Sequence, residues 1–140
     1  MDPRLVEALE PVLRDARSTV GVVPEICDRS WADDPRPTWA GSDPVAPEQL
    51  WAEMHAPDGS IWGVWVLADD PPAERVVRAA DQVQEWVVEQ LWGLRRSTSW
   101  PGCPEHPDTH PLAPTLWDGV PVWACPRSGR VACEIGALGR

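Results

Sequence analysis

The chain has 140 residues, enough for one domain with a buried core, and its 43% of hydrophobic residues excludes a chain that is disordered by composition. Its 22 acidic and 12 basic residues give a net charge of −10, which repels phosphate backbones and makes nucleic acid an unfavoured partner. All basic residues are Arg and all ten aromatic residues are Trp, a tryptophan-rich composition that indicates a GC-rich bacterial genome.

The sequence contains no signal-peptide pattern and no apolar segment of membrane-spanning length. We therefore expect a soluble, cytoplasmic protein with no membrane partner. In that compartment cysteines more often serve as metal ligands or reduced core residues than as disulfides. This applies to the four cysteines of the chain, Cys27, Cys103, Cys125 and Cys133.

The first predicted element is a helix that begins at the N-terminus. Asp2 is a favoured cap residue, Pro3 suits the first helical position, and Gly21 can end the helix. Apolar residues recur between them at three- and four-residue spacing. Pro11 lies inside this pattern, so we expect it to kink the helix or split it into two.

Residues 22–48 are rich in turn residues, with short strands expected near Ile26–Trp31 and Thr38–Gly41. A hairpin follows, because Leu50–His55 and Ile61–Leu67 flank a turn that contains Asp-Gly. The second hairpin strand is apolar on both faces, which predicts a central strand covered on both sides.

A long amphipathic helix is predicted after Asp70, with Gly93 as its natural end, and it should pack on the hairpin. Three short strands are expected later, at Thr115–Trp117, Val120–Cys125 and Arg130–Ile135. The fold class is therefore α+β: a small antiparallel sheet packed by a long helix, with a C-terminal β-meander. We divide the chain into a helix–hairpin–helix core, residues 1–94, and a segment docked on it, residues 95–140.

Two turns near the C-terminus combine cysteine with proline. Cys103-Pro-Glu-His106 is the first, and Cys125-Pro-Arg-Ser128-Gly is the second. Residues 100–136 resemble the zinc-ribbon class, in which two such turns hold one metal ion. The resemblance implies that Cys103, His106 and Cys125 are zinc ligands. It departs from the class at Ser128, where a second cysteine would stand.

His110 is the expected replacement ligand, since it lies four residues after His106 in the same turn. It would complete a closed Cys₂His₂ site, which is typical of structural zinc. Asp108 or Cys133 could instead supply the fourth ligand, although Cys133 and Cys27 are interpreted as small core residues. With water as the fourth ligand, the site would be an open catalytic centre with Glu105 or Asp108 as base.

We therefore interpret the chain as a small acidic zinc-binding protein that acts through protein contacts, as an adaptor, regulator or immunity-type inhibitor. A basic protein partner suits its charge, and a non-enzymatic role is favoured. One alternative is a zinc-dependent hydrolase with a Cys₂His-plus-water centre. The other is a nucleic-acid-binding zinc ribbon, which requires an exposed arginine cluster formed by Arg95, Arg96, Arg127 and Arg130.

Overall fold

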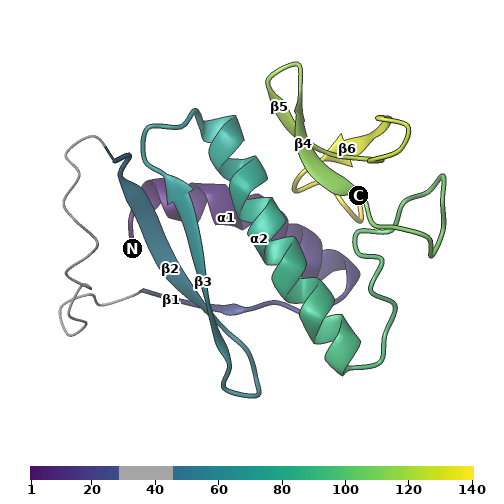
Figure 1. Cartoon of the computed structure of the whole chain (residues 1–140), viewed down its shortest axis with the longest axis horizontal. Coiled ribbons are helices and arrows are strands. Elements are labelled where there is room, and N and C mark those ends of the chain that lie inside the picture. The colour runs from purple at the N-terminus through teal and green to yellow at the C-terminus, as the bar shows by residue number, and fades with distance from the viewer. Residues whose placement is uncertain (29–45) are drawn as a thin grey trace.

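The computed structural model describes residues 1–28 and 46–140, which contain two helices and two three-stranded antiparallel sheets. The first sheet has the order β1-β2-β3 and the second the order β4-β5-β6, with α2 between the two sheets (Figure 1). The elements in chain order are α1 (Pro3–Thr19), β1 (Glu25–Asp28), β2 (Gln49–His55), β3 (Ile61–Leu67), α2 (Pro72–Gly93), β4 (Ala113–Trp117), β5 (Val120–Ala124) and β6 (Val131–Glu134).

Helix α1 begins as its sequence predicts. The Asp2 carboxylate accepts the backbone N–H of Arg4, and Pro3 occupies the first turn. The helix ends just before Gly21, whose φ of 68° suits a residue without a side chain. Of the two outcomes predicted for Pro11, a kink or a split, the structure excludes the split, because α1 runs unbroken through this residue. Apolar residues on both sides of Pro11 are buried, and their burial outweighs the roughly 3 kcal/mol cost of an internal proline.

The predicted hairpin is present as β2 and β3, with His55 opposite Ile61 at the turn. Strand β1 covers the first part of the strand expected near Ile26–Trp31 and pairs with β2. The strand expected at Thr38–Gly41 lies outside the described residues.

In the sheet that the described residues form, the expectation that the second hairpin strand is central was wrong, because β3 lies at the edge. Its core face carries the buried Val64 and Val66. On the other face, Trp65 is covered by side chains rather than by another layer: the Trp51 ring lies 6.0 Å away and the Arg78 guanidinium lies 4.8 Å above it. Covering of this kind explains why an edge strand can be apolar on both faces.

Helix α2 spans the predicted range and contacts α1, β3, β4 and β5. Its buried face joins α1 and the first sheet in one hydrophobic cluster. The same cluster continues without a break into the C-terminal part of the chain, where it includes Trp100, Cys103, Leu112, Trp123 and Cys125. Neither helix is long and apolar enough to cross a membrane, as judged over the described residues.

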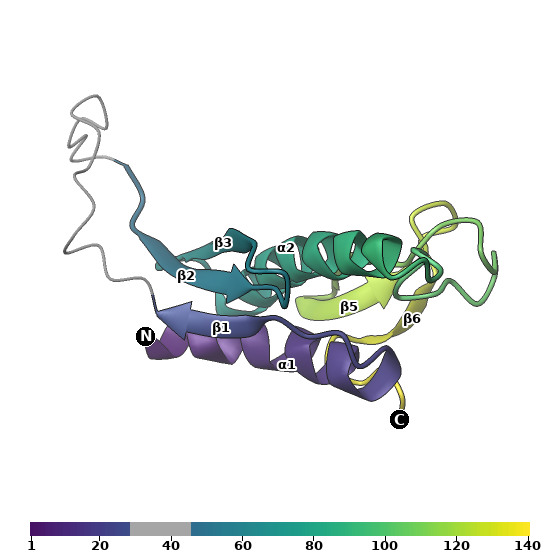
Figure 2. The same ribbon diagram turned by 90° about the horizontal axis from the view of Figure 1, so that it is seen from below.

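The second sheet is formed by the three strands expected near the C-terminus. Its first turn, Asp118-Gly119, has positive φ at both residues, as a tight hairpin turn requires. The sheet is attached to α1 through Asp15, which is fully buried. The Asp15 carboxylate accepts the indole N–H of Trp123 at 2.8 Å and the backbone N–H groups of Gly136 and Leu138 at 2.6 and 2.8 Å. Figure 2 shows the second sheet beside the C-terminal end of α1.

Candidate metal centre

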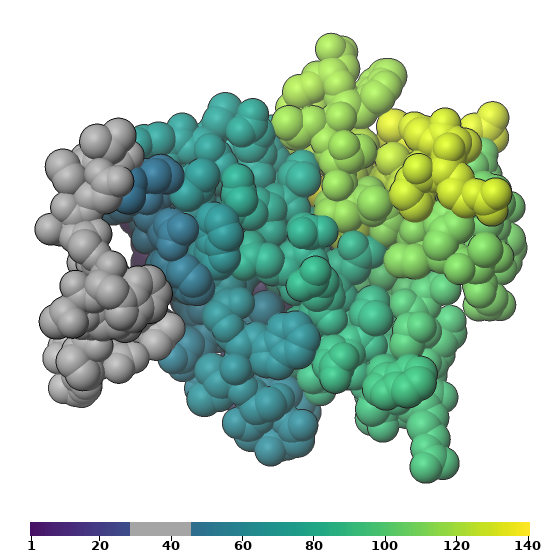
Figure 3. Space-filling view, viewed as in Figure 1, coloured from purple at the N-terminus to yellow at the C-terminus, as the bar shows by residue number. Residues whose placement is uncertain are grey.

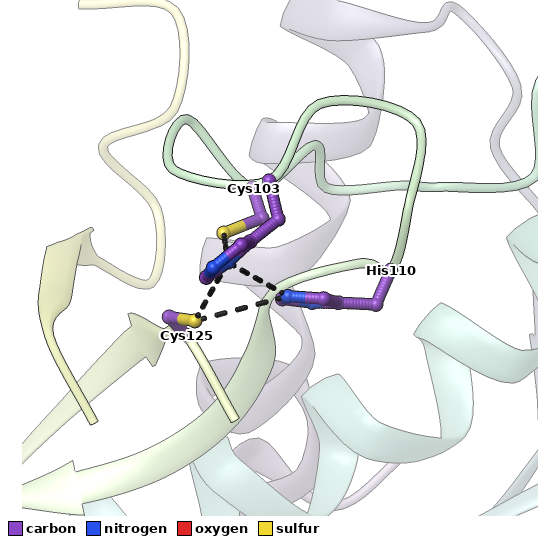
Figure 4. A group of neighbouring side chains, drawn as sticks. Cys103, His110 and Cys125 are labelled. Carbon is purple, nitrogen blue, oxygen red and sulfur yellow. Dashed lines mark hydrogen bonds between the residues drawn. The ribbon is translucent and has the colours of Figure 1, made fainter. Parts of the chain in front are cut away.

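The four predicted ligand side chains lie together. Cys103, His106 and His110 belong to the loop between α2 and β4, and Cys125 follows β5 directly. One ligand atom from each residue can be chosen so that all four atoms lie within 4.8 Å of one another. Figure 4 shows the side chains of Cys103, His110 and Cys125 converging on one point from these two segments.

Four of the six distances between the ligand atoms are close to those of a tetrahedral zinc site. His106 Nδ1 lies 3.6 Å from Cys103 Sγ and 3.5 Å from Cys125 Sγ, and His110 Nε2 lies 3.8 Å from Cys125 Sγ. Zinc–sulfur bonds of about 2.3 Å and zinc–nitrogen bonds of about 2.0–2.1 Å place sulfur and nitrogen about 3.6 Å apart in a tetrahedron. The two nitrogens are 3.0 Å apart, slightly closer than the tetrahedral value of about 3.3 Å.

Hydrogen bonding alone does not account for this arrangement. His106 Nδ1 faces two sulfur atoms and His110 Nε2 at the same time. A ring nitrogen has either one proton or one lone pair, so it satisfies only one of the three neighbours well. A cation among the four atoms would bind the lone pairs of all of them at once.

The backbone favours the tautomer of His110 that metal binding needs. Its Nδ1 lies 2.9 Å from the carbonyl oxygen of Pro111, which can only accept a hydrogen bond. The proton therefore resides on Nδ1, and Nε2 directs a lone pair at the cluster. Histidine ligands in zinc sites are held in this way by a carbonyl or carboxylate.

The second turn stabilises Cys125 as a thiolate. The Ser128 backbone N–H points at Cys125 Sγ from 3.5 Å, and the Gly129 N–H closes the turn on the Cys125 carbonyl at 2.8 Å. Donors of this turn, Ser128 first and the Arg127 backbone N–H after it, lower the pKa of the Cys125 thiol to about 6. Serine at 128 thus removes a ligand but keeps the backbone donor that a metal-bound sulfur needs.

Glu105 links the first turn to the second. Its carboxylate accepts the Ser128 hydroxyl at 2.6 Å and lies 3.2 Å from the Arg130 guanidinium. The Ser128 hydrogen bond first, and the Arg130 charge second, lower the pKa of Glu105 below its usual range. The carboxylate is therefore held ionised between two partners.

Helix α2 positions the loop that carries three of the four residues. The Gln84 side-chain amide donates to the carbonyls of Trp100 and Leu112, at 3.1 and 2.6 Å, and so joins the two ends of the loop. Cys103 and Cys125 are each 2% exposed, whereas both histidines are half-buried. The sulfur side of the cluster therefore faces the core and the imidazole side faces solvent.

The other candidate ligands lie outside this cluster. Asp108 accepts the Ser97 hydroxyl at 3.4 Å. The third histidine of the chain, His55, lies in the first sheet, where it contacts Glu53 at 2.8 Å. Cys133 lies opposite Trp123 in the second sheet and packs against the core, where burial raises its pKa. Cys27 lies in β1, and its pKa is raised by burial too.

Sequence reasoning missed two residues that position the site. Gln84 is a polar residue beside the apolar stripe of α2, and no pattern in the sequence connects it to a loop that begins 16 residues later. For Asp15 the sequence contains one indication of burial, since this carboxylate lies between Leu13 and Ala16 on the buried side of α1. The three N–H groups that donate to it lie more than 100 residues away, so its partners could not be predicted.

Comparisons of the chain with protein-family models, with curated proteins and with solved structures found no match.

Proposed function

We propose that Cys103, His106, His110 and Cys125 bind one Zn²⁺ in a closed tetrahedral site. The observation that carries the proposal is the convergence of two sulfur and two nitrogen atoms within 4.8 Å. Thiolate and imidazole together suit zinc, whereas calcium and magnesium prefer oxygen ligands. A zinc site also needs contacts that orient its ligands. The Pro111 carbonyl orients His110 in this way, and the Ser128 backbone N–H does so for Cys125.

The proposed ion has a structural role. Four protein ligands leave no position for a reacting water, which a hydrolase with three ligands requires. Glu105, the candidate base of that alternative, is engaged by Ser128 and Arg130. In this proposal the ion joins the loop after α2 to the β5–β6 turn, as in a zinc ribbon, and residues 95–140 form the metal-dependent part of the chain.

The nucleic-acid alternative receives little support from the arginines on which it depends. Arg96 donates to the Val20 carbonyl and Arg130 pairs with Glu105, so these two side chains serve separate local contacts. A net charge of −10 opposes phosphate binding over the whole chain.

We propose further that the protein acts through contacts with a basic partner protein, as an adaptor, regulator or immunity-type inhibitor. Its acidic charge would steer such a partner towards it. Trp92 and Trp117 are 73% and 62% exposed, and large exposed aromatic side chains are enriched where proteins bind one another.

Metal content of three purified variants tests the zinc site. We expect one zinc per chain in the wild type, loss of zinc in Cys125→Ser, and retention in Cys133→Ser, which makes the same change at a cysteine outside the cluster. A wild-type protein without metal, or equal zinc in Cys125→Ser, would overturn the proposal.

A further inference from the structure

On the edge of β3 that faces away from β2, the backbone of Trp65 is covered by a side chain, whereas the backbone nearer the hairpin turn is open. The Trp65 N–H donates to the Gln82 side-chain carbonyl at 3.0 Å, and the Gln82 amide donates back to the Trp65 carbonyl at 2.7 Å. The backbone of Trp65 therefore faces away from β2. Residues two apart in a strand direct their backbone groups alike, so Gly63 and Ile61 also direct theirs outwards. Within residues 1–28 and 46–140, no strand pairs with this side of β3.

A cleft of about 680 Å³ lies next to this open edge. It is bounded by the hairpin, by residues 21–23 and by the C-terminal end of α2, and three tryptophans line it: Trp62, Trp86 and Trp92. Trp92 and Leu94 are 73% and 58% exposed, which leaves an apolar surface uncovered at its rim. In Figure 3 a notch separates the lobe of the hairpin turn from the lobe at the end of α2.

Among the described residues, the lining of the cleft carries two carboxylates, those of Asp58 and Glu89, and no basic side chain. Arg95 and Arg96 border it at the end of α2. Asp58 is held in place at the hairpin turn because it accepts the backbone N–H and the hydroxyl of Ser60, at 2.9 and 2.7 Å. Carboxylates beside exposed indole rings favour arginine or lysine, which gains from the opposite charge and from stacking on the ring face.

We propose that an extended, basic segment of a partner protein binds here as an additional strand. Its backbone pairs with Ile61 and Gly63, and its basic side chains lie against Asp58, Glu89 and Trp92. Strand addition supplies affinity through main-chain hydrogen bonds and specificity through the side chains that enter the cleft. This inference rests on the proposed contact role and identifies the surface and the class of partner. The cleft is lined by other residues than the metal centre, so it does not depend on zinc.

Titration of the ¹⁵N-labelled full chain with three short capped peptides tests the inference by NMR. The probe alternates arginine and valine. One control alternates glutamate and valine, and the other is the basic peptide with its backbone methylated at alternate nitrogens. We expect the unmodified basic peptide to cause saturable shifts at the amides of Ile61 and Gly63 and at the indole N–H groups of Trp62 and Trp92. Both control peptides should bind at least tenfold more weakly.

Charge reversal in α2 supplies the matched control on the protein side. Glu89→Arg should weaken binding of the basic peptide at least tenfold. Glu85→Arg makes the same charge change one turn earlier, at an exposed position outside the cleft lining, and should weaken binding far less.

Three results would overturn the inference: equal binding of the methylated peptide, shifts confined to other surfaces, or the same shifts on raising the protein concentration alone, which would assign the cleft to a second copy of this chain. Binding of the basic peptide at another surface would refute binding in the cleft but would still support the proposed role in protein contacts. Failure of every peptide to bind anywhere would count against both. Zinc content, measured on the same sample, reports on the metal centre separately.

Discussion

His110 is the residue on which the closed form of the metal centre depends. The Pro111 carbonyl holds the proton on Nδ1, so Nε2 enters the cluster already prepared for a metal ion. This contact also sets the direction of the ring, because the hydrogen bond and the lone pair lie on opposite sides of the imidazole. The fourth ligand position is thus prepared by backbone as well as by side chain.

Replacement of His110 tests this reading. His110→Ala removes a ligand and should lower zinc affinity by more than about a hundredfold. Removing only an outer contact of a ligand lowers metal affinity by about tenfold to a hundredfold, so the loss of the ligand itself should cost more. Asp108→Asn, which removes the rival carboxylate but keeps a residue that tolerates the φ of 55° at this position, should leave affinity unchanged. Competition with a chromophoric chelator measures both. If Asp108→Asn lowered zinc affinity more than His110→Ala, Asp108 would be the ligand instead.

Asp15 attaches the second sheet to α1. Asp15→Ala leaves the Trp123 indole and two backbone N–H groups without their acceptor, so we expect a loss on the order of 3 kcal/mol in the free energy of unfolding. Asp81→Ala, at an exposed position of α2, should cost about 0.5 kcal/mol or less. Urea denaturation of the zinc-loaded proteins measures the difference. Equal losses in the two variants would refute this role.

At the residue scale, the sequence predicts what depends on local turn chemistry. Cys103, His106 and Cys125 follow from the two proline-containing turns, and His110 follows only from the thiolate missing at Ser128. Their grouping in space agrees with the prediction. Gln84 and Asp15 could not be predicted, because each acts on residues that the fold, rather than the chain, brings near.

At the scale of elements, the loop from Trp100 to Leu112 is held at both ends by one side chain of α2. Gln84→Ala removes both hydrogen bonds and should lower zinc affinity about tenfold to a hundredfold, because three ligands then rest on a looser loop. Gln82→Ala, in the same helix, also removes hydrogen bonds, but those connect to β3.

The Gln82 variant should therefore lower the free energy of unfolding while its zinc affinity stays at the wild-type value. Chelator competition and urea denaturation, applied to both glutamine variants, separate the two roles. A similar fall in zinc affinity in both would show that α2 affects the metal centre only through general stability.

The helices and strands were largely predictable from the sequence, whereas the elements that pack or pair with each of them in space were not. Asp2, Pro3 and the Asp58-Gly59 turn act within a few residues, so the first helix and the hairpin were readable. The edge position of β3 was not readable, because its order in the sheet depends on β1, which comes from a distant part of the chain. Its two apolar faces indicated a second covering layer where the structure uses Trp51 and Arg78.

At the scale of the whole molecule, one hydrophobic cluster spans both sheets, and the metal centre lies at its C-terminal end. The division into residues 1–94 and 95–140 stays a prediction that metal removal can test. Chelation should raise amide exchange most in the two turns that hold Cys103 and Cys125, and less in the rest of residues 101–140. Amides of α1, α2 and the hairpin should stay protected, since their core does not need the ion. Uniform loss of protection over the described residues would show one metal-dependent unit instead.

The most direct measurement of the central claim is X-ray absorption at the zinc edge on the purified full chain, together with zinc content. We predict one zinc per chain with two sulfur neighbours at about 2.3 Å and two nitrogen neighbours at about 2.0–2.1 Å. A protein that binds no metal would contradict the claim outright. A shell with a single sulfur, or with a water oxygen in place of one imidazole, would contradict the closed Cys₂His₂ site and favour an open centre.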